Sequence, residues 1–421
     1  MKKEQLIGCC ATFVITLLLL TMCNQFLQQK DGQAKNMDFY KQEEDFDVLF
    51  LGSSHMIMDI SPIEIWNDYG IISYNLGNYG QWLPGDYWIL RSALQYTTPD
   101  LVVVDVYAIC KDEMNSPIHK ATLHNMLDPM LLSSVKINAI TDLMPKENRL
   151  EFFVPYSLYH QRWDGINSTF FVEPSFGFEK GAENTWKVQS GGVLPPTIID
   201  STQVNNSGSL GREYLIKIIE LCQENNIEIL LIALPFAADE NMQEWMNSAY
   251  GIAESYDINY LDLLRQPTGI NYLTDMYDAG HLNSSGAYKI SKIVGAYITE
   301  HYDFPYAGAE SESLAKQWNL DWEHHMENKI ALLSKESNLE NYLMRLMDSD
   351  FRCQIYLKDE NILLGDNWLK EFTDSISVEY RDEPFDSLDA DIQISVSRVD
   401  SGEIVDYAFF DYQRETAYVR R

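Results

Sequence analysis

The stretch "DVLFLGSSHMIMDISPIEIW", residues 47–66, decides how the chain is expected to fold. Its apolar run Val48–Leu51 has the length of a buried strand and stops at a glycine. Two serines and a histidine follow. Next, Ser61-Pro62-Ile63-Glu64 has the pattern of a capping box with proline at the first helical position. The stretch therefore predicts a strand, a turn that carries reactive side chains, and a helix that ends near Tyr69.

The same alternation continues along the chain. Apolar runs typical of buried strands lie at 71–76, 99–107 and 227–235. Segments with helical spacing of apolar residues lie at 86–96, 212–226 and 284–301. Strands that alternate with helices predict an α/β fold, in which helices cover both sides of a parallel sheet.

Composition divides the chain into parts. We expect a membrane anchor at 1–30, a polar linker at 31–45, and an α/β domain at 46–305 with an insertion at about 110–207. After "HYDFPYAGAESES" two helical stretches broken near Ser334 precede several short strands, which predicts a small C-terminal α+β module at 306–421.

The N-terminus carries the clearest signal of location. The run Leu6–Cys23 is apolar and uncharged, and its length at about 1.5 Å per residue is roughly 27 Å, enough to cross a bilayer with its flanks. Lys2 and Lys3 favour a cytoplasmic N-terminus. Because no A-x-A-like site follows, an uncleaved anchor is favoured over a signal peptide. The bulk of the chain is then extracytoplasmic in a single-pass membrane protein.

Charge and cysteine content exclude several classes of function. The net charge of -32 argues against a nucleic-acid partner, because phosphate binding needs a basic surface. The six cysteines form no CxxC pair and no disulfide framework, which favours a bacterial exported protein over a eukaryotic secretory one. No phosphate-loop or dinucleotide fingerprint is present, and we expect no metal or other cofactor.

Candidate catalytic residues lie at strand ends. Ser54 follows the first strand, where ligands of open parallel sheets bind. The distant segment "DMYDAGHLNSSG" supplies Asp278 and His281, so one loop can provide a general base and the acid that orients it. Asp275 is a rival for the acid. Backbone N–H groups at Ser54 and Gly77 are candidates for an oxyanion hole.

These residues together resemble the SGNH/GDSL hydrolase superfamily. Gly52-Ser53-Ser54 resembles its G-D-S block I, Gly77 its block II, and Asp278-Ala279-Gly280-His281 its D-x-x-H block V. The N-terminal anchor and "YDAGHLNSSG" are most similar to a membrane-anchored Gram-positive branch. This branch includes the teichoic-acid D-alanylation partner protein and relatives that work beside membrane O-acyltransferases. The resemblance covers about 46–305 and implies a three-layer, flavodoxin-like parallel sheet.

The resemblance also implies a function. It points to a serine acyl-ester hydrolase or O-acyltransferase of the cell membrane that acts on a cell-envelope polysaccharide, a teichoic-acid-like polymer or an acylated carrier. A multi-span membrane O-acyltransferase is the implied partner. One departure favours an alternative, a weak or inactive docking subunit for such an acyltransferase. The strand that usually ends in the block III Asn here ends in Asp105, followed by Tyr107.

Further side chains are candidates for substrate binding or have a purely structural interpretation. An aromatic and basic segment could form a sugar-binding wall or pack under a loop. His55 could be a satisfied histidine at the end of a strand, and His324-His325 could be a solvated helix face. The candidates for substrate binding are His55, Tyr159, His160, Arg162 and Trp163.

Overall fold

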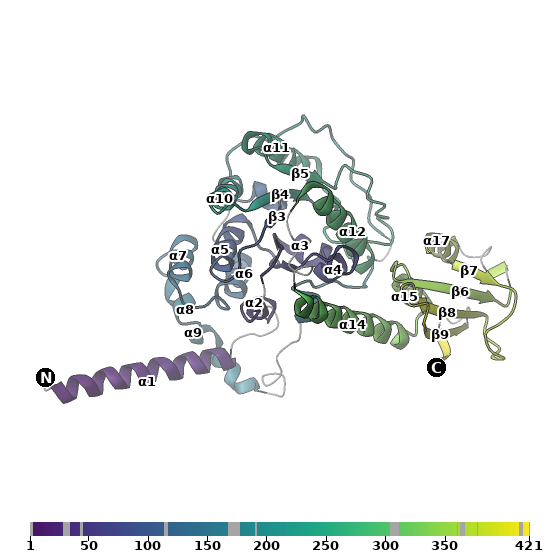
Figure 1. Ribbon diagram of the computed structural model, residues 1–421, viewed down its shortest axis with the longest axis horizontal. Helices are drawn as coiled ribbons and strands as arrows, with labels where there is room; N and C mark the ends of the chain where they lie inside the picture. Colours follow the sequence, from purple (N-terminus) through teal and green to yellow (C-terminus); the bar gives the residue numbers. More distant parts are fainter. Residues whose placement is uncertain are drawn as a thin grey trace.

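The computed structural model describes residues 3–27, 34–42, 45–112, 117–166, 177–189, 192–303, 311–359, 361–362, 367–376, 378–411 and 416–420. Figure 1 shows a central α/β body, a helix that projects from it at the N-terminal end, and a smaller sheet at the C-terminal end.

The body is built on a five-stranded sheet whose strands all run parallel. Its order is β2-β1-β3-β4-β5, the order of flavodoxin-like folds. The predicted α/β class and parallel sheet are therefore confirmed. The strands are β1 (Val48–Leu51), β2 (Ser73–Asn75), β3 (Leu101–Asp105), β4 (Glu228–Ala233) and β5 (Asn259–Asp262).

Side chains of the central strands alternate between two apolar cores. Leu49 and Leu51 of β1 join one core, whereas Val48 and Phe50 join the other. The first core is closed by α5 (Leu83–Ala93), α10 (Leu210–Glu224) and α11 (Glu240–Tyr256), and the second by α12 (Ser284–His301). Because a strand's side chains point alternately to opposite faces, this pattern requires cover on both sides. The sheet is thus the middle of three layers.

Two short helices follow β1. Helix α3 (Ser54–Asp59) begins immediately after the turn and was not expected from the sequence. Helix α4 (Pro62–Tyr69) ends at Tyr69 as expected, and Gly70 follows it as a left-handed C-cap. The capping-box prediction is wrong, however, because the Ser61 side chain makes no cap hydrogen bond and Glu64 turns instead toward a distant helix.

The predicted insertion contains several helices. Trp88 of α5 and Tyr214 of α10 both bond to Asp142 of α7, so the insertion is fastened to the first core. The helices are the 3₁₀ helix η1 (Tyr107–Cys110), α6 (Pro117–Leu127), α7 (Ser134–Leu143), α8 (Arg149–Phe153), α9 (Tyr156–Tyr159), η2 (His160–Gly165) and η4 (Gly177–Glu179).

The N-terminal segment forms helix α1 (Lys3–Leu27). In the described part of the chain, no helix combines the length and apolarity needed to cross a membrane. Part of the predicted linker is structured. Residues Ala34–Phe39 form helix α2, and the Phe39 side chain is buried. Lys35 is also buried, and its Nζ donates to the carbonyls of Asn75 and Gly77. Burial lowers the pKa of Lys35 to about 7.

The C-terminal part has a second sheet of order β10-β9-β8-β6-β7, in which only β6 and β7 pair in parallel. The predicted break between two helices lies between α14 and α15. The boundary at 305/306 stays a prediction. The elements are α14 (Glu312–Lys335), α15 (Leu339–Arg345), β6 (Phe351–Leu357), α17 (Asn367–Ser375), β7 (Val378–Arg381), β8 (Ile392–Arg398), β9 (Ile404–Asp411) and β10 (Thr416–Arg420).

A buried charge cluster joins α14 to α4. The Lys329 Nζ lies 2.5 Å from a Glu64 oxygen, 2.8 Å from an Asp348 oxygen and 2.6 Å from an Asp350 oxygen. The three carboxylates are close enough to hold a metal ion, but the Lys329 ammonium lies among them. The adjacent His325 is buried and bonds to Glu64, so the interpretation of His324-His325 as a solvated face is wrong for His325.

Candidate active site

The turn after β1 depends on a glycine. Gly52 has φ +157°, and a Cβ there would lie 2.8 Å from the Cβ of Asp105. A side chain at this position is therefore excluded both by conformation and by space. The tight turn lets α3 start at Ser54, and the Ser53 side chain accepts a hydrogen bond from the His55 N–H at the start of the helix. Ser54 is left half-buried beyond the carboxyl end of β1.

The structure brings the three predicted catalytic residues together. His281 Nε2 lies 2.7 Å from Ser54 Oγ, and His281 Nδ1 lies 2.8 Å from Asp278 Oδ1. These distances connect a hydroxyl, an imidazole and a carboxylate in the order that nucleophilic catalysis requires. The Asp278 side chain is 41% exposed and that of His281 is 22% exposed, so the site is open to solvent.

Backbone bonds hold the loop that carries His281. The Tyr277 N–H donates to the His281 carbonyl, and Ala237 after β4 donates to the Ala279 carbonyl. The Leu282 N–H donates to Asp59 Oδ1 at the end of α3, at 2.9 Å. Helix α3 thus supplies the serine at its first residue and supports the histidine loop at its last. Sequence reasoning missed Asp59 because a lone Asp at the end of an apolar run carries no signal.

Asp275, the rival acid, serves the fold instead. It is fully buried, and its carboxylate accepts from Lys289 Nζ at 2.7 Å and from Ser285 Oγ at 3.1 Å. The carboxylate bonded to His281 belongs to Asp278. Of the two acids that the sequence left open, the geometry therefore favours Asp278.

Gly77 does not have the predicted geometry of an oxyanion-hole donor. Its N–H donates to Asn75 Oδ1 at 3.0 Å and is therefore engaged within the protein. A Cβ at Gly77 would lie 2.9 Å from the Met56 Cβ and 3.0 Å from the Ser53 carbonyl. The glycine allows β2 and α3 to approach closely. The Ser54 N–H, in the first turn of α3, is the remaining predicted donor, because such groups have no acceptor inside the helix.

His55 lies beside the triad. Its ring is 5.3 Å from that of His281 and packs on Tyr107 and Phe236. Burial, and then the nearby His281 and Lys111, lower the pKa of His55 to about 3, so this imidazole is neutral. Its Nδ1 has no hydrogen-bond partner in the described chain. Of the five predicted substrate-binding side chains, His55 is the one that the structure joins to the triad.

The other four surround the end of α1. Tyr159 bonds to Asp128, which follows α6, at 2.6 Å, and His160 packs on Tyr156. Arg162 donates to the Leu27 carbonyl at 2.7 Å, and the Trp163 ring contacts that of Phe26. The printed sequence gives no sign of these contacts, since the partners are more than a hundred residues away for Arg162 and Trp163. The structure therefore does not bring this aromatic and basic segment to Ser54.

Buried carboxyl groups flank the turn. Burial raises the pKa of Asp105 to about 7, although the Tyr107 N–H that donates to it opposes the shift. Burial also raises the pKa of Asp86 to about 7, with Asp105 adding to the effect. Both groups hold a proton in the fold at a pH where an unfolded aspartate has lost it. Asp105, in the place of the amide that the family resemblance leads one to expect, is thus neutral below about pH 7.

We expect Asp105→Asn to flatten the dependence of stability on pH. The folded pKa is raised, so the stabilisation is complete below about pH 4 and is lost as the pH rises toward 7. Melting temperatures between pH 4.5 and 8, roughly spanning the two pKa values, should fall less in the variant than in the parent chain. Asp164→Asn, at an exposed carboxyl, is the control. An unchanged slope would contradict a buried, protonated Asp105.

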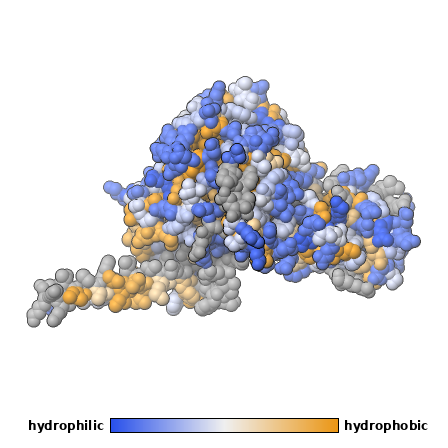
Figure 2. Space-filling model, in the orientation of Figure 1, coloured by the Kyte–Doolittle hydropathy of each residue, from blue (hydrophilic) through white to orange (hydrophobic). Residues whose placement is uncertain are grey.

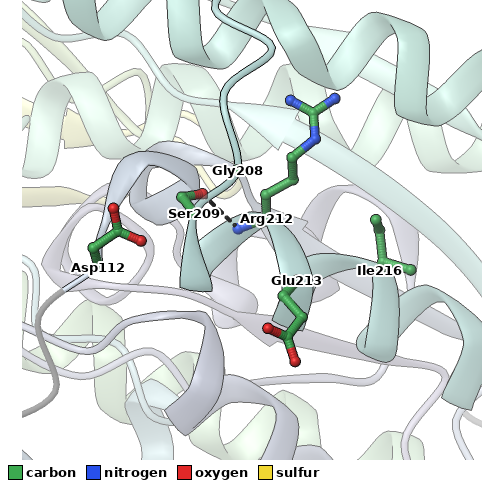
Figure 3. A pocket seen from close by; sticks show the side chains of 6 residues that line it. All are labelled: Asp112, Gly208, Ser209, Arg212, Glu213 and Ile216. Atoms are coloured by element: carbon green, nitrogen blue, oxygen red, sulfur yellow. Dashed lines mark hydrogen bonds between the residues drawn. The ribbon is translucent and has the colours of Figure 1, made fainter.

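A surface hollow elsewhere does not belong to this site. Figure 3 shows its lining side chains around the start of α10. Ser209 is the N-cap of α10, and its side chain accepts a hydrogen bond from the Arg212 N–H at 3.0 Å. The Asp112 side chain accepts a hydrogen bond from the Leu210 N–H at 2.7 Å. These are ordinary bonds of a helix start. The lining residues are Asp112, Gly208, Ser209, Arg212, Glu213 and Ile216, and none belongs to the triad.

Comparisons with known proteins give structural resemblances alone. No family model and no curated protein matches the sequence. A putative lipolytic protein of the G-D-S-L family from Desulfitobacterium hafniense is 12% identical with a TM-score of 0.30, over 59% of this chain and 97% of that one. A putative acylhydrolase from Bacteroides fragilis is 12% identical with a TM-score of 0.31, over 65% and 97%. A GDSL-like lipase from Bacteroides thetaiotaomicron is 11% identical with a TM-score of 0.31, over 64% and 98%. At such low TM-scores and identities these resemblances decide neither family nor activity, and the description of the fold rests on the strand order.

Proposed function

We propose that the chain is a serine acyl-ester hydrolase or O-acyltransferase of the SGNH/GDSL type. The observation that carries the proposal is the connection of Ser54, His281 and Asp278 at the carboxyl edge of a parallel sheet. A hydroxyl and an imidazole 2.7 Å apart are within the range for proton transfer. The carboxylate at Nδ1 fixes the ring and stabilises the imidazolium that forms.

The proposed reaction proceeds in two halves. Ser54 Oγ attacks the carbonyl carbon of an acyl ester, and its proton passes to His281 Nε2. The tetrahedral adduct collapses, the bond to the leaving oxygen breaks, and His281 returns the proton to that oxygen. Water or a glycan hydroxyl then attacks the acyl-Ser54 ester and gives its proton to His281. This second adduct collapses as the bond to Ser54 Oγ breaks, and His281 returns the proton to that oxygen, which regenerates the serine. No cofactor takes part in these steps.

The proposed substrates are acylated cell-envelope polymers. We place the activity at the outer side of a bacterial, Gram-positive membrane, where a polysaccharide or teichoic-acid-like polymer, or an acylated carrier, meets the site. A multi-span membrane O-acyltransferase is the proposed partner. Support comes from the sequence resemblance and from the solvent-open triad, which a polymer side group can reach.

A chromogenic acyl ester tests the reaction. We expect the purified full chain to release a burst of chromophore of about one equivalent, followed by slower turnover, because acylation precedes deacylation. Added glycan alcohols that shorten the second phase and carry the acyl group would identify transfer; water alone would identify hydrolysis. A folded chain that shows neither burst nor turnover would contradict the enzyme proposal.

Two observations favour the alternative, a docking subunit with weak or no activity. The Gly77 N–H is engaged by Asn75, and the end of β3 carries Asp105 where the superfamily has an amide donor. The oxyanion would then rely on few donors, and removing one such donor costs about 10²–10³-fold in rate. A chain without burst that still co-purifies with a membrane acyltransferase would establish this role.

Membrane attachment is part of the proposal and has its own test. Apolar side chains of α1 such as Val14, Leu18 and Leu19 are exposed in the isolated chain, which favours a lipid environment for this helix. We expect the mature protein to keep residues 1–30 and to stay with membranes after a high-salt wash. N-terminal sequencing of the extracted protein checks this, and a mature start between Cys23 and Asn36 would contradict it.

A further inference from the structure

Exposed apolar side chains gather on the insertion, next to the end of α1. Among the side chains of residues 117–166 whose burial the structure describes, nine large apolar ones are exposed, although this segment is a small part of the chain. Figure 2 shows apolar residues on the side of the body from which α1 projects. The helices that carry these side chains are successive neighbours in space, α7 beside α8, α8 beside α9 and α9 beside η2. Large apolar patches on soluble proteins usually have a binding role. The nine are Leu131, Leu132, Ile137, Leu150, Phe153, Val154, Leu158, Trp163 and Ile166, and we call them the α7–η2 face.

The α7–η2 face is continuous with α1. Phe26 contacts the ring of Trp163 at a centroid distance of 6.4 Å, and Arg162 donates to the Leu27 carbonyl. Helix α1 itself exposes apolar side chains on several sides, including Ile15 and Met22. An environment that covers α1 therefore meets the face at Trp163, whose ring contacts that of Phe26 near the end of the helix.

The charge of this segment points to the same environment. Residues 117–166 contain five Lys or Arg and five Asp or Glu, so their formal charge is zero, whereas the whole chain carries -32. The acidity of the chain is thus concentrated elsewhere. Bacterial membrane surfaces are anionic and repel acidic protein surfaces over about a Debye length. The α7–η2 face beside α1 therefore lies on a segment that such a surface does not repel.

We infer that the α7–η2 face lies against the surface of a lipid bilayer. Leucine, phenylalanine and tryptophan side chains enter the boundary between headgroups and acyl chains, while the neutral segment around them avoids repulsion. The inference concerns how the body is seated and not what the triad does. It goes beyond attachment by α1, because it assigns contact with lipid to the insertion of the α/β body as well.

Tryptophan probes in bromolipid vesicles test the inference on the full chain. Leu132 is 80% exposed on the face, and Leu194, on a loop outside the face, is 86% exposed. Leu132→Trp and the matched control Leu194→Trp are each reconstituted in phosphatidylcholine–phosphatidylglycerol vesicles, with and without dibrominated phosphatidylcholine. The signal is the difference in emission between variant and parent chain.

We expect the indole introduced by Leu132→Trp to be quenched several-fold more than that introduced by Leu194→Trp. Leu150→Trp, at 71% exposure, should behave like Leu132→Trp and guards against a local effect of one substitution. Equal quenching at all three positions would overturn the inference. A blue-shifted but unquenched probe at Leu132 would also overturn it and would assign the face to a protein partner. The ester burst is measured on the same samples, so failure of the activity and failure of the seating are distinguishable.

Discussion

Ser54→Ala is expected to abolish labelling of the chain by a fluorophosphonate probe and to reduce ester turnover by about 10⁴-fold or more. The serine provides the only hydroxyl that bonds to His281 Nε2 among the described contacts. Labelling and turnover should fall nearly as far in His281→Ala, because the remaining hydroxyl has no base within reach. Asp278→Ala should lose less, since this carboxylate orients the base and moves no proton itself.

Two further variants make the result specific. The double variant Ser54→Ala/His281→Ala should be no worse than Ser54→Ala, because groups that act as one unit are not additive. Ser53→Ala is the matched control: it removes a neighbouring hydroxyl that caps the His55 N–H and does not bond to His281. Labelling that survives Ser54→Ala would place the nucleophile elsewhere. A folded parent chain that never labels would favour the docking subunit.

Lys329→Met is expected to lower the free energy of unfolding by about 3–5 kcal/mol. The substitution removes the ammonium that lies among Glu64, Asp348 and Asp350, and it leaves three carboxylates within a buried site. These carboxylates raise the pKa of Lys329 well above its usual value, although burial lowers it, so the charge persists at neutral pH. Urea denaturation of the full chain measures the change.

The control is Lys335→Met, which removes an exposed lysine at the end of the same helix and should change stability little. Glu64→Gln added to Lys329→Met should restore part of the loss, because it removes one of the opposed carboxylates. A loss for Lys329→Met no larger than that for Lys335→Met would show that the cluster does not stabilise the attachment of α14 to α4.

Long periodic elements of the fold were predictable. The apolar runs of β1, β3 and β4 and the helical spacing of α10 and α12 show in the sequence because each buries a repeating face. Two short elements were not predicted: α3 has six residues beginning in a serine-rich turn, and β5 has four residues with an exposed start. Their form depends on neighbours that are distant along the chain.

The same distinction holds for the site. Ser54 and His281 are 227 residues apart. Their pairing could nevertheless be predicted, because a serine nucleophile needs a general base and an acid that orients it. Glu64 and Lys329 are 265 residues apart, and Glu64 fits a local helix-capping pattern so well that its real partner was hidden. Gly77 was assigned by its place in a motif, but the Asn75 side chain that engages its N–H could be seen only in three dimensions.

The buried Lys35 limits how far the catalytic site can lie from the end of α1. Its Nζ bonds to the Gly77 carbonyl, and Gly77 packs on Ser53, so α2 is fixed beside the nucleophile. Between Leu27 at the end of α1 and Ala34 at the start of α2 there are seven peptide steps, which span at most about 25 Å when fully extended. Wherever α1 is held, the start of α2 therefore lies within about 25 Å of its end. A polymer must bring its acyl groups to a site whose neighbouring helix is confined to that range.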